Sequence, residues 1–441
     1  MQDWIEKHGV SEVECIVPDL AGAARGKTIT AAKFNGGQAL RLPQCIFLQS
    51  VAGSYPELFN KIMPTDLDML LQPDASTIRI QPWSTRKTAQ VINDCFDKDD
   101  KPIEFAPRFV LRKVLELYRA EGWKPVVAPE LEFYLLQPNL DPTEPLQPPT
   151  GGTGREQKKG QSFNIDAVND FASMFDDMHN YCKTQALEID GLIHEEGIAQ
   201  MEINLLHGDP LDLADQAFLF KRTVRETALR HNLQATFMAK PIENQPGSAM
   251  HIHQSVVDLD SGENNFSTAQ GMPNKLLLSH IAGLQQILPD AMALILPYVN
   301  SYRRIVRDMS APINFQWGFD NRTVGFRVPD NEPKSMRVEN RLASADVNPY
   351  LAIATSLACG YIGMKQGLRP TDPLTGSAYN EPAQLSRDWY RSLERLSQSQ
   401  PLRDVLGDVF IDVYVAVKEV EFDNFMNVIS PWEREHLLLN V

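Results

Sequence analysis

The sequence contains little cysteine, and what it has is scattered. There are five cysteines among 441 residues, an odd number without regular spacing. Small disulfide-stapled secreted domains use dense, even sets of cysteines, so we expect free thiols and a reducing compartment, the cytoplasm. The cysteines are Cys15, Cys45, Cys95, Cys182 and Cys359.

An excess of positive charge and long apolar runs are also missing. The formal net charge is −15 and there is no basic run, which argues against a nucleic-acid partner and slightly favours cationic substrates. No apolar stretch approaches the roughly 20 residues that span a bilayer. The opening residues, MQDWIEKHGV, lack the basic and then apolar order of a signal peptide. We therefore expect a soluble protein with neither a nucleic-acid nor a membrane partner.

The phosphate-binding sequence G-x-x-x-x-G-K-[ST] is absent as well, so any phosphate must be bound by other means. Arginines are dense between residues 303 and 341, many of them beside apolar neighbours. A guanidinium group offers a planar fork of donors that fits phosphate and carboxylate groups. The cluster therefore indicates an anion-binding site, although a surface network of ion pairs would also explain it. Its members are Arg303, Arg304, Arg307, Arg322, Arg327, Arg337 and Arg341.

What the sequence does have is a set of acidic residues among apolar ones. In residues 191–206, GLIHEEGIAQMEINLL, the acids are Glu195, Glu196 and Glu202. From residue 201 onward polar and apolar side chains alternate as in a strand, and Gly197 disfavours a continuous helix. A turn near Gly197 would bring Glu195 and Glu202 to one point. Buried carboxylates need a partner, so this stretch predicts an ion site. A solvated loop acid with one salt-bridged glutamate is the other interpretation.

Three further stretches place polar residues at every second position of an apolar segment. Residues 126–136 carry Glu130 and Glu132, and residues 247–256 carry His251 and His253. Residues 335–342 carry Arg337, Glu339 and Arg341. In a strand each set shares one face, and together the sets predict a polar cleft. Carboxylates and an imidazole without cysteine suit Mg²⁺ or Mn²⁺ better than zinc. Each stretch alone would also fit an ordinary half-exposed strand.

The length allows two or three domains and a large core. The sequence pattern of residues 1–103 predicts short strands and turns, with strands at 13–17 and 77–81. Helices are expected at 106–121, 169–185 and 210–232, a long core helix at 276–295, and helical structure over 389–441. Strands alternate with helices, so we expect an α/β or α+β catalytic part. The polar, proline-rich segment 137–159 is too long for an ordinary connection, which makes it a lid, a subunit-contact loop or a disordered flap.

An ordered set of motifs resembles the glutamine synthetase superfamily. In chain order these are E-x-E-F, H-E-x-x-x-x-Q-x-E, A-T-F-M-x-K-P, G-S-x-M-H-x-H, N-S-Y-x-R, N-R-x-x-x-x-R and R-x-E-x-R followed by N-P-Y. They begin at residues 130, 194, 235, 247, 300, 321 and 337, so the resemblance covers nearly the whole chain. Through residues 191–226 the chain is most similar to the gamma-glutamylpolyamine synthetase branch.

The resemblance implies a fold and an assembly. The fold is α+β, with a small amino-terminal beta-grasp domain at residues 1–103. Residues 104–441 form the catalytic domain, a curved antiparallel sheet with flanking helices. The family forms dodecamers of two six-membered rings, in which each active site lies between the amino-terminal domain of one subunit and the catalytic domain of the next. We therefore expect a homo-oligomer, although composition and periodicity do not show it.

The resemblance also assigns roles to the motif residues. ATP and two or more Mg²⁺ or Mn²⁺ ions are the implied cofactors. Glu132, Glu195 and Glu202 would hold one ion, and Glu130, His251 and Glu339 the other. His253 and Ser255 match positions that contact ATP, and Arg337 a phosphate contact. Gly247, Arg304 and either Arg327 or Arg341 match positions that hold the carboxylates of the amino acid, and Arg322 one that stabilises the transferring phosphoryl group.

The implied reaction is ATP-dependent ligation of glutamate through a γ-glutamyl phosphate. Two departures from the family pattern concern the nitrogen substrate. The family's F-D-G-S-S, whose Asp helps bind ammonium, corresponds to residues 47–51, FLQSV, without an acid. The flap glutamate that precedes Ala-Pro corresponds to Ser310. Both acids of the ammonium site are missing, so we expect a ligase that joins glutamate to an organic amine, a polyamine or a monoamine, in amine catabolism or nitrogen assimilation.

Three other functions stay open at this point. The nearest is an ammonium-using glutamine synthetase. A second is a catalytically inactive relative with a structural or regulatory role, against which the complete set of ion ligands counts. The third, phosphoryl transfer to a guanidine, rests on a fold-level relation alone.

Overall fold

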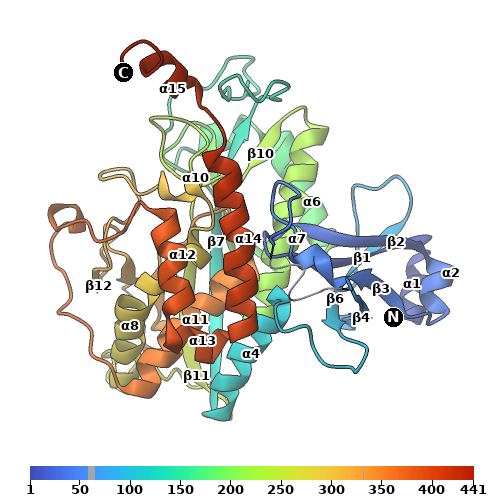
Figure 1. Ribbon diagram of the computed structural model, residues 1–441, viewed down its shortest axis with the longest axis horizontal. Helices are drawn as coiled ribbons and strands as arrows, with labels where there is room; N and C mark the ends of the chain where they lie inside the picture. Colours follow the sequence, from blue (N-terminus) through green and yellow to red (C-terminus); the bar gives the residue numbers. More distant parts are fainter. Residues whose placement is uncertain (58–64, 331) are drawn as a thin grey trace.

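A computed structural model describes residues 1–57, 65–330 and 332–441 of the chain, and it contains two β-sheets (Figure 1). The smaller sheet is built by the amino-terminal part and lies to one side of the larger body. The larger sheet begins at β7, Trp123–Leu136, and runs through the middle of that body. The molecule is α+β, as predicted, and the division between residues 103 and 104 remains our proposal for the domain boundary.

The amino-terminal sheet has the strand order β2-β1-β6-β4-β3, with β5 paired to β6. The antiparallel β1–β2 hairpin and the parallel pairing of β1 with β6 place Val13, Cys15 and Val91 in its core, all fully buried. The strand predicted at 13–17 is confirmed as β1. The one predicted at 77–81 is shorter, because the side chain of Asp74 caps a 3-10 turn at Ala75–Thr77 first. The strands are β1 Glu12–Pro18, β2 Ala24–Thr30, β3 Leu40–Pro43, β4 Asp68–Pro73, β5 Arg79–Ile80 and β6 Thr88–Phe96.

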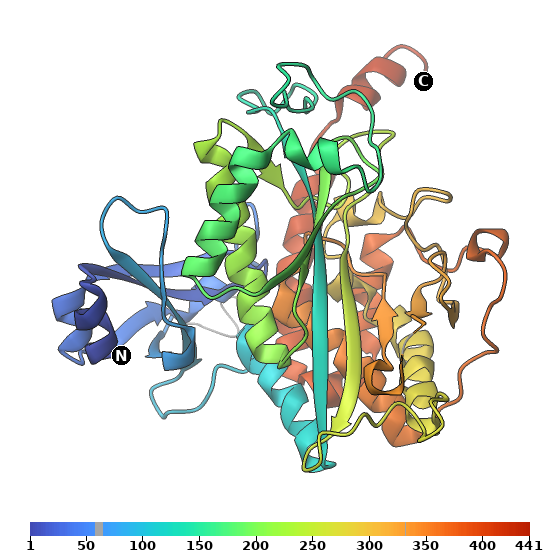
Figure 2. The ribbon, with the colours of Figure 1, turned by 180° about the vertical axis from the view of Figure 1, so that it is seen from behind.

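The larger sheet is curved and has the order β12-β13-β14-β11-β7-β9-β8, with β10 paired to β7. Within the described residues its neighbours are antiparallel, apart from β12 and β13. Strands β7 and β11 are its long central pair (Figure 2). After β7 come β8 Ile189–His194, β9 Gln200–Leu205, β10 Gln234–Thr236, β11 Met250–Asp258, β12 Trp317–Phe319, β13 Phe326–Val328 and β14 Val338–Asn340.

Helices pack against this sheet, which Figure 2 shows with β7 and β11 in front of α11 and α14. Helices α4 and α7 contact β7, and α11 contacts β11. Helix α11 is apolar on all sides and almost entirely buried, as expected of a core helix. The helices are α1 Gln2–His8, α2 Ala31–Asn35, α4 Pro107–Ala120, α5 Ile165–Asn169, α6 Ala172–Thr184, α7 Pro210–Arg230, α8 Lys275–Ile287, α9 Met292–Ile295, α10 Val299–Tyr302, α11 Pro349–Gln366, α12 Trp389–Gln398, α13 Gln400–Leu406, α14 Asp408–Met426 and α15 Pro431–His436.

The helices predicted at 106–121, 169–185 and 210–232 are confirmed as α4, α6 and α7. The long helix predicted at 276–295 is wrong: α8 ends at Ile287, and a 3-10 turn at Leu288–Asp290 separates it from α9. Pro289 lies in that turn and has no backbone N–H to continue the helical pattern. The helical segment 389–441 is divided into four helices, with breaks near Pro401, at Gly407 with φ 109°, and before Pro431.

A buried arginine of α4 links the amino-terminal part to α7. Arg108 is 3% exposed and donates to Asp74 and Asp94 of the amino-terminal part at 2.7 Å each, and to Asp215 of α7 at 2.8 Å. The hydroxyl of Tyr350 also donates to Asp215. Partial burial acts to raise the pKa of Asp74. Hydrogen bonds from Ser76 and Arg108 outweigh this effect and lower that pKa to about 2.

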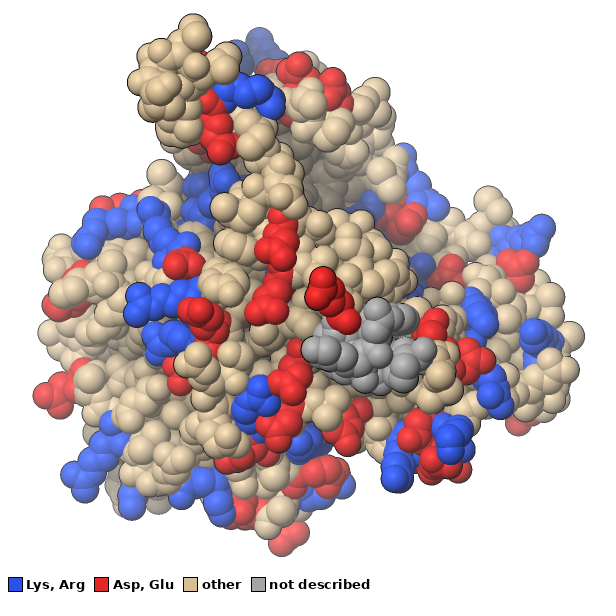
Figure 3. Space-filling model, in the orientation of Figure 1, with Lys and Arg blue, Asp and Glu red and all other residues tan. Residues whose placement is uncertain are grey.

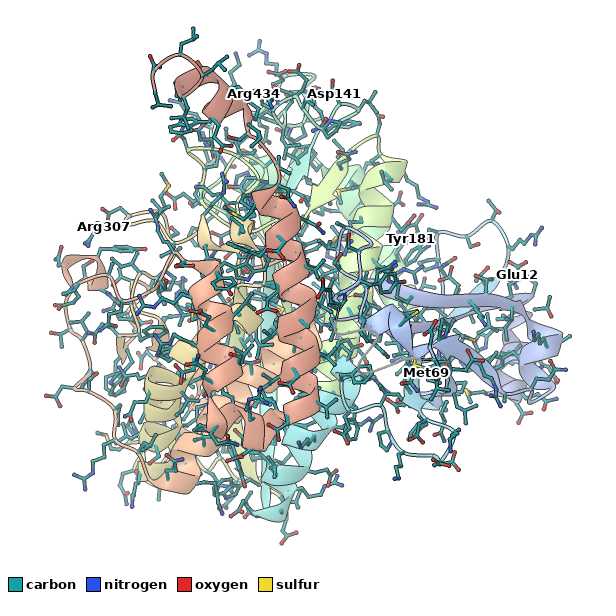
Figure 4. The ribbon with its side chains drawn as sticks, viewed as in Figure 1. Glu12, Met69, Asp141, Tyr181, Arg307 and Arg434 are labelled. Atoms are coloured by element: carbon teal, nitrogen blue, oxygen red, sulfur yellow. The ribbon has the colours of Figure 1, made fainter. Side chains whose placement is uncertain are left out.

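Two irregular segments lie at the end of the molecule where Figure 4 labels Asp141 and Arg434. Segment 137–159 has one isolated bridge, between Thr150 and Glu156, and is otherwise coil and turn. The carboxy-terminal arm, residues 425–441, projects from the body and is mostly uncharged in Figure 3. Its exposed apolar residues include Val428, Ile429, Trp432, Leu438, Leu439 and Val441. None of the helices in the described part of the chain combines the length and apolar composition needed to cross a bilayer.

Candidate active site

A cavity of about 610 Å³ opens on the face of the larger sheet where β7, β9, β11 and β14 present their polar side chains. A second cavity of about 460 Å³ adjoins it. The two share Glu130, Asn204, His253 and Arg337 in their walls, so they form one continuous cleft. Its two-part shape suits a substrate that is bound beside a nucleotide.

The predicted turn at Gly197 is confirmed and brings two acids into the larger cavity. Strand β8 ends at His194 and β9 begins at Gln200. The Glu195 N–H donates to the Gln200 carbonyl at 2.8 Å, and the Gly197 N–H donates to the Gln200 side chain at 3.0 Å. A Cβ at residue 197 would lie 2.0 Å from the Tyr134 hydroxyl, so only glycine fits there. Glu195 and Glu202 both line the cavity as a result.

Cross-strand register assembles the other predicted ligands. Glu132 of β7 lies opposite Glu202 of β9, and Glu130 lies opposite His251 of β11. His253 is paired in turn with Glu339 of β14. Because alternate residues of a strand share a face, one register places all of these side chains on the cavity side. The shared-face predictions for these strands are confirmed, and the lining residues include Glu130, Glu132, Glu195, Glu202, His251, His253, Arg337, Glu339 and Arg341.

Short contacts tie the central imidazoles to the acids. His251 Nδ1 lies 3.2 Å from Glu130 Oε2, and His253 Nε2 lies 2.9 Å from Glu130 Oε1. Arg341 and Arg327 both donate to Glu339, Arg327 at 3.0 Å. The second ring nitrogen of His251, Nε2, is buried and has no hydrogen-bond partner among the described residues. A buried nitrogen left in this state is a ready metal ligand.

Two groups of side chains have ligand atoms close enough to share an ion. One consists of Glu130, His253 and Glu339, and the other of Glu130, Glu202 and His251, with all atoms of each group within 4.8 Å of one another. These groups overlap the two sets that the resemblance implies but divide them differently, and His253 joins a group although it was assigned to ATP. The donor chemistry fits hard divalent ions such as Mg²⁺ or Mn²⁺. The assignment of each ligand to a particular ion stays a prediction.

The electrostatics of the acids favour bound cations. Burial and then the neighbouring carboxylates raise the pKa of Glu132 and of Glu202. Burial also raises the pKa of Glu195. Like charges at 4 Å repel by roughly 4 kcal/mol under an effective dielectric of 20. Burial followed by the charge of Arg341 lowers the pKa of His251 to about 4, so this imidazole is neutral at pH 7 and able to bind a metal ion.

The arginines of the cluster occupy three kinds of position. Arg322, Arg327, Arg337 and Arg341 line the larger cavity and can meet phosphate or carboxylate groups there. Arg304 is not among the described lining residues. It is 3% exposed, and its guanidinium donates at 3.0 Å to the backbone carbonyls of Arg341 and Leu342. Its predicted role at a substrate carboxylate remains a prediction, and its present contacts support the cavity wall instead. Arg303 and Arg307 are exposed, and Arg307 lies at the outer edge of the molecule (Figure 4).

The remaining predicted residues lie along the cleft. Gly247 lines the larger cavity, and a Cβ at this position would lie 2.5 Å from the Arg304 side chain, so the backbone must approach closely there. Ser255 lines the smaller cavity together with His253. Gln200 links two parts of the cavity wall, because its Nε2 donates to Glu132 at 3.1 Å and to the Gly247 carbonyl at 3.2 Å.

Several residues of the cleft have no signal in the sequence. Asp190, His207 and Lys334 line the smaller cavity, and Asp308 and Tyr379 line the larger one. They lie at strand ends or in loops, where residue periodicity carries no information. Ser310 also lines the larger cavity, and its hydroxyl donates to Glu196 at 2.5 Å. The segment 47–51 lies elsewhere, against α14, where the Val51 N–H donates to Glu421 at 2.8 Å.

Comparison with known proteins identifies the class. The family described as "Glutamine synthetase, catalytic domain" matches residues 104–437, and the chain belongs to this family of ATP-dependent glutamate ligases. The similar proteins include the gamma-glutamylputrescine synthetase PuuA of Escherichia coli K12, 34% identical over 97% of this chain and 92% of that protein. The glutamate–isopropylamine ligase of a Pseudomonas species is 31% identical over 98% of this chain and 96% of its own.

Other relatives fit the same class. A glutamine synthetase of Methanocaldococcus jannaschii is 32% identical over 84% of this chain and 83% of its own length. Among solved structures, GmaS without ligand superposes with a TM-score of 0.84 at 24% identity, covering 100% of this chain and 99% of the other. A complex of GmaS with ADP gives the same TM-score over 99% of both chains. At this identity the structures establish the fold alone.

Proposed function

We propose that the protein joins the γ-carboxylate of glutamate to an organic amine at the expense of ATP. One observation carries this proposal: Ser310, a neutral residue, stands at the cavity where the family pattern has an acid for ammonium, while all the predicted ion ligands line the same cavity. Relatives named for putrescine and isopropylamine at 34% and 31% identity support the choice of an organic amine.

The cleft gives each substrate a place. The adenosine end of ATP fits the smaller cavity beside His253 and Ser255, with its phosphates directed toward Arg337. Glutamate occupies the larger cavity, where Arg327 and Arg341 offer guanidinium groups and Gly247 leaves room for the backbone of the amino acid. Divalent ions held by the carboxylates and His251 would neutralise phosphate charge. Arg322, at the open side, is placed to stabilise the transferring phosphoryl group.

The reaction proceeds in two balanced steps. A γ-carboxylate oxygen of glutamate attacks the γ-phosphorus of ATP, which forms γ-glutamyl phosphate and releases ADP. The free amine then attacks the carbonyl carbon, the C–N bond forms, and phosphate leaves with the C–O bond electrons while the amine loses a proton. Activation is required because a carboxylate does not react with amines in water. The protein contributes position and preorganised charge to both steps.

We also propose the family's dodecameric assembly. Residues 47–51 lie against α14 and do not line the larger cavity of their own chain, so any contribution they make to an active site would be to that of a neighbouring subunit. Figures 1 and 4 show the rest of the amino-terminal part on the side of the molecule away from Arg307. The apolar residues of the carboxy-terminal arm are exposed in the single chain, as expected of a subunit contact. Sedimentation at micromolar concentration tests this, and an active monomer would contradict it.

An amine panel tests the proposed activity. The assay contains ATP, Mg²⁺ or Mn²⁺ and glutamate, and it measures phosphate release. We expect kcat/KM for the best organic amine to exceed that for ammonium by about tenfold or more. Mass spectrometry should identify the product as the γ-glutamyl amide. A preference for ammonium would establish the second candidate, a glutamine synthetase. That candidate is favoured by one contact, because Glu196 supplies a carboxylate beside Ser310.

A further inference from the structure

Ser310, the neutral residue at the cavity rim, lies beside a carboxylate. Its hydroxyl donates to Oε2 of Glu196, which belongs to the β8–β9 turn, 114 residues away in the chain. Both side chains are exposed and both line the larger cavity. At position 310, where the family pattern has an acid, the cavity rim thus has a serine with a carboxylate from another element beside it.

The turn that carries Glu196 is held by hydrogen bonds of the two residues that follow it. The Gly197 N–H donates to Gln200, and the Ile198 N–H donates to the side chain of Gln245, both at 3.0 Å. The preceding residue, Glu195, is half-buried and belongs to the predicted ion ligands, whereas Glu196 reaches the exposed rim. The carboxylates of Glu195 and Glu196 therefore lie at different depths in the same cavity.

A second acid lies at the same rim. Asp308, two residues before Ser310 in the loop, is exposed and lines the cavity. Both acids act on Tyr379: burial raises the pKa of its hydroxyl, Arg341 and Arg304 oppose this, and the charges of Asp308 and Glu196 raise it further. The rim thus presents negative charge around a phenol, whereas the floor holds the buried Nε2 of His251, which has no hydrogen-bond partner in the described part of the chain.

We propose that Glu196 binds the non-reacting, positively charged end of the amine substrate and makes an amine with two cationic nitrogens the preferred class. This inference rests on the proposed ligation of an organic amine. The reacting nitrogen must reach the acyl phosphate near the buried ligands, so the rest of the amine extends toward the rim. A second ammonium group there meets Glu196, with Asp308 adding to the negative potential, whereas a simple alkylamine places only carbon beside these charges.

The test compares two amines of equal length, putrescine and butylamine, which differ in the second nitrogen. In the wild-type holoenzyme we expect kcat/KM to favour putrescine by about tenfold or more. Glu196→Gln keeps the shape of the side chain and removes its charge. The ratio of kcat/KM for putrescine to kcat/KM for butylamine should therefore fall about fivefold, as expected for the loss of one partly exposed ion pair. Most of this change should be a higher KM for putrescine. The matched control is Glu188→Gln, the same change at an exposed acid near the start of β8 that lies outside the described lining of the cavity; it should leave the ratio unchanged.

Three results would overturn the inference. Equal kcat/KM values for putrescine and butylamine in the wild type would show that the rim does not bind a second ammonium group. A proportional loss with both amines in Glu196→Gln, matched by Ser310→Ala, would show that Glu196 only holds the 307–312 loop in place. Turnover with ammonium but with neither amine would remove the proposed function itself, and this inference with it.

Discussion

Glu132 of β7 and Glu202 of β9 lie directly opposite each other in the larger sheet. Cross-strand neighbours on one face have Cβ atoms about 5 Å apart, a distance at which like charges are destabilising. Both side chains are almost completely buried, 7% and 6% exposed, and burial raises the pKa of each. A divalent cation held between two acids in this relationship would offset their repulsion, and the first two predictions test that proposal.

Glu202→Ala should abolish turnover. The substitution removes one ligand and leaves Glu132 facing an incomplete site, so we expect phosphate release to fall by about a hundredfold or more at saturating Mg²⁺. Glu188→Gln serves as the control, and circular dichroism should show that both variants are folded. Turnover near the wild-type rate with an unchanged Mg²⁺ or Mn²⁺ response would refute the assignment of this site.

Divalent ions should stabilise the folded protein even without substrates. Ions that bind only the folded state add about 2.7 kcal/mol per site at a hundredfold excess over Kd, so Mg²⁺ or Mn²⁺ should raise Tm by several degrees over an EDTA-treated sample. The shift should shrink in Glu202→Ala. Scanning fluorimetry over a metal titration measures this, with Ca²⁺ as a comparison. An equal shift in wild type and variant would place the ions elsewhere.

The extent to which the sequence predicts this site depends on the range of the interactions involved. Alternation within 126–136, 247–256 and 335–342 depends on neighbouring residues, and it correctly predicts which side chains share a face. Register depends on pairing between distant strands, so the Glu132–Glu202 relationship has no local signal. The Ser310–Glu196 contact links two loops, and sequence spacing cannot indicate it. The predicted helix at 276–295 failed for a local reason, since the apolar pattern continues through Pro289.

Arg304 illustrates a different limit. The family pattern marks its position, but the sequence does not show whether the guanidinium faces the cavity or the wall. In the structure its donors are directed to two backbone carbonyls. Burial, opposed by the charge of Glu132, lowers the pKa of Arg304 to about 10, so the group remains charged at pH 7.

The stability of the protein in acid should depend on the contact between the amino-terminal part and helices α4 and α7. The pKa of Asp74 is about 2 in the folded protein, below the value of about 3.9 in an unfolded chain. A lowered folded pKa adds stability above the unfolded value, and that contribution is lost as the pH falls toward the folded pKa. Asp74→Asn should therefore cost about 1 kcal/mol at pH 6, allowing for solvent screening. The difference from wild type should narrow as the pH falls from about 5 to 3.

Urea unfolding at each pH measures that difference, with Asp68→Asn as the control because Asp68 is an exposed acid at the start of β4. A gap that stays constant from pH 6 to pH 3 would show that the ion pair with Arg108 does not contribute through the charge of Asp74.

Ser310→Glu tests how the rim chooses its nitrogen substrate. In the wild type the Ser310 hydroxyl donates to Glu196, whereas a glutamate cannot donate and would bring a second carboxylate against the first. We expect the repulsion and the larger side chain to displace the 307–312 loop and to lower kcat/KM for the best organic amine by about tenfold. Ammonium use should rise only slightly, because residues 47–51 still lack an acid. Ser310→Ala, which removes the hydrogen bond without adding charge, should give a smaller loss. The measurement is kcat/KM for ammonium and for the best amine in all three proteins, and an amine reaction untouched by Ser310→Glu would show that position 310 does not border the amine.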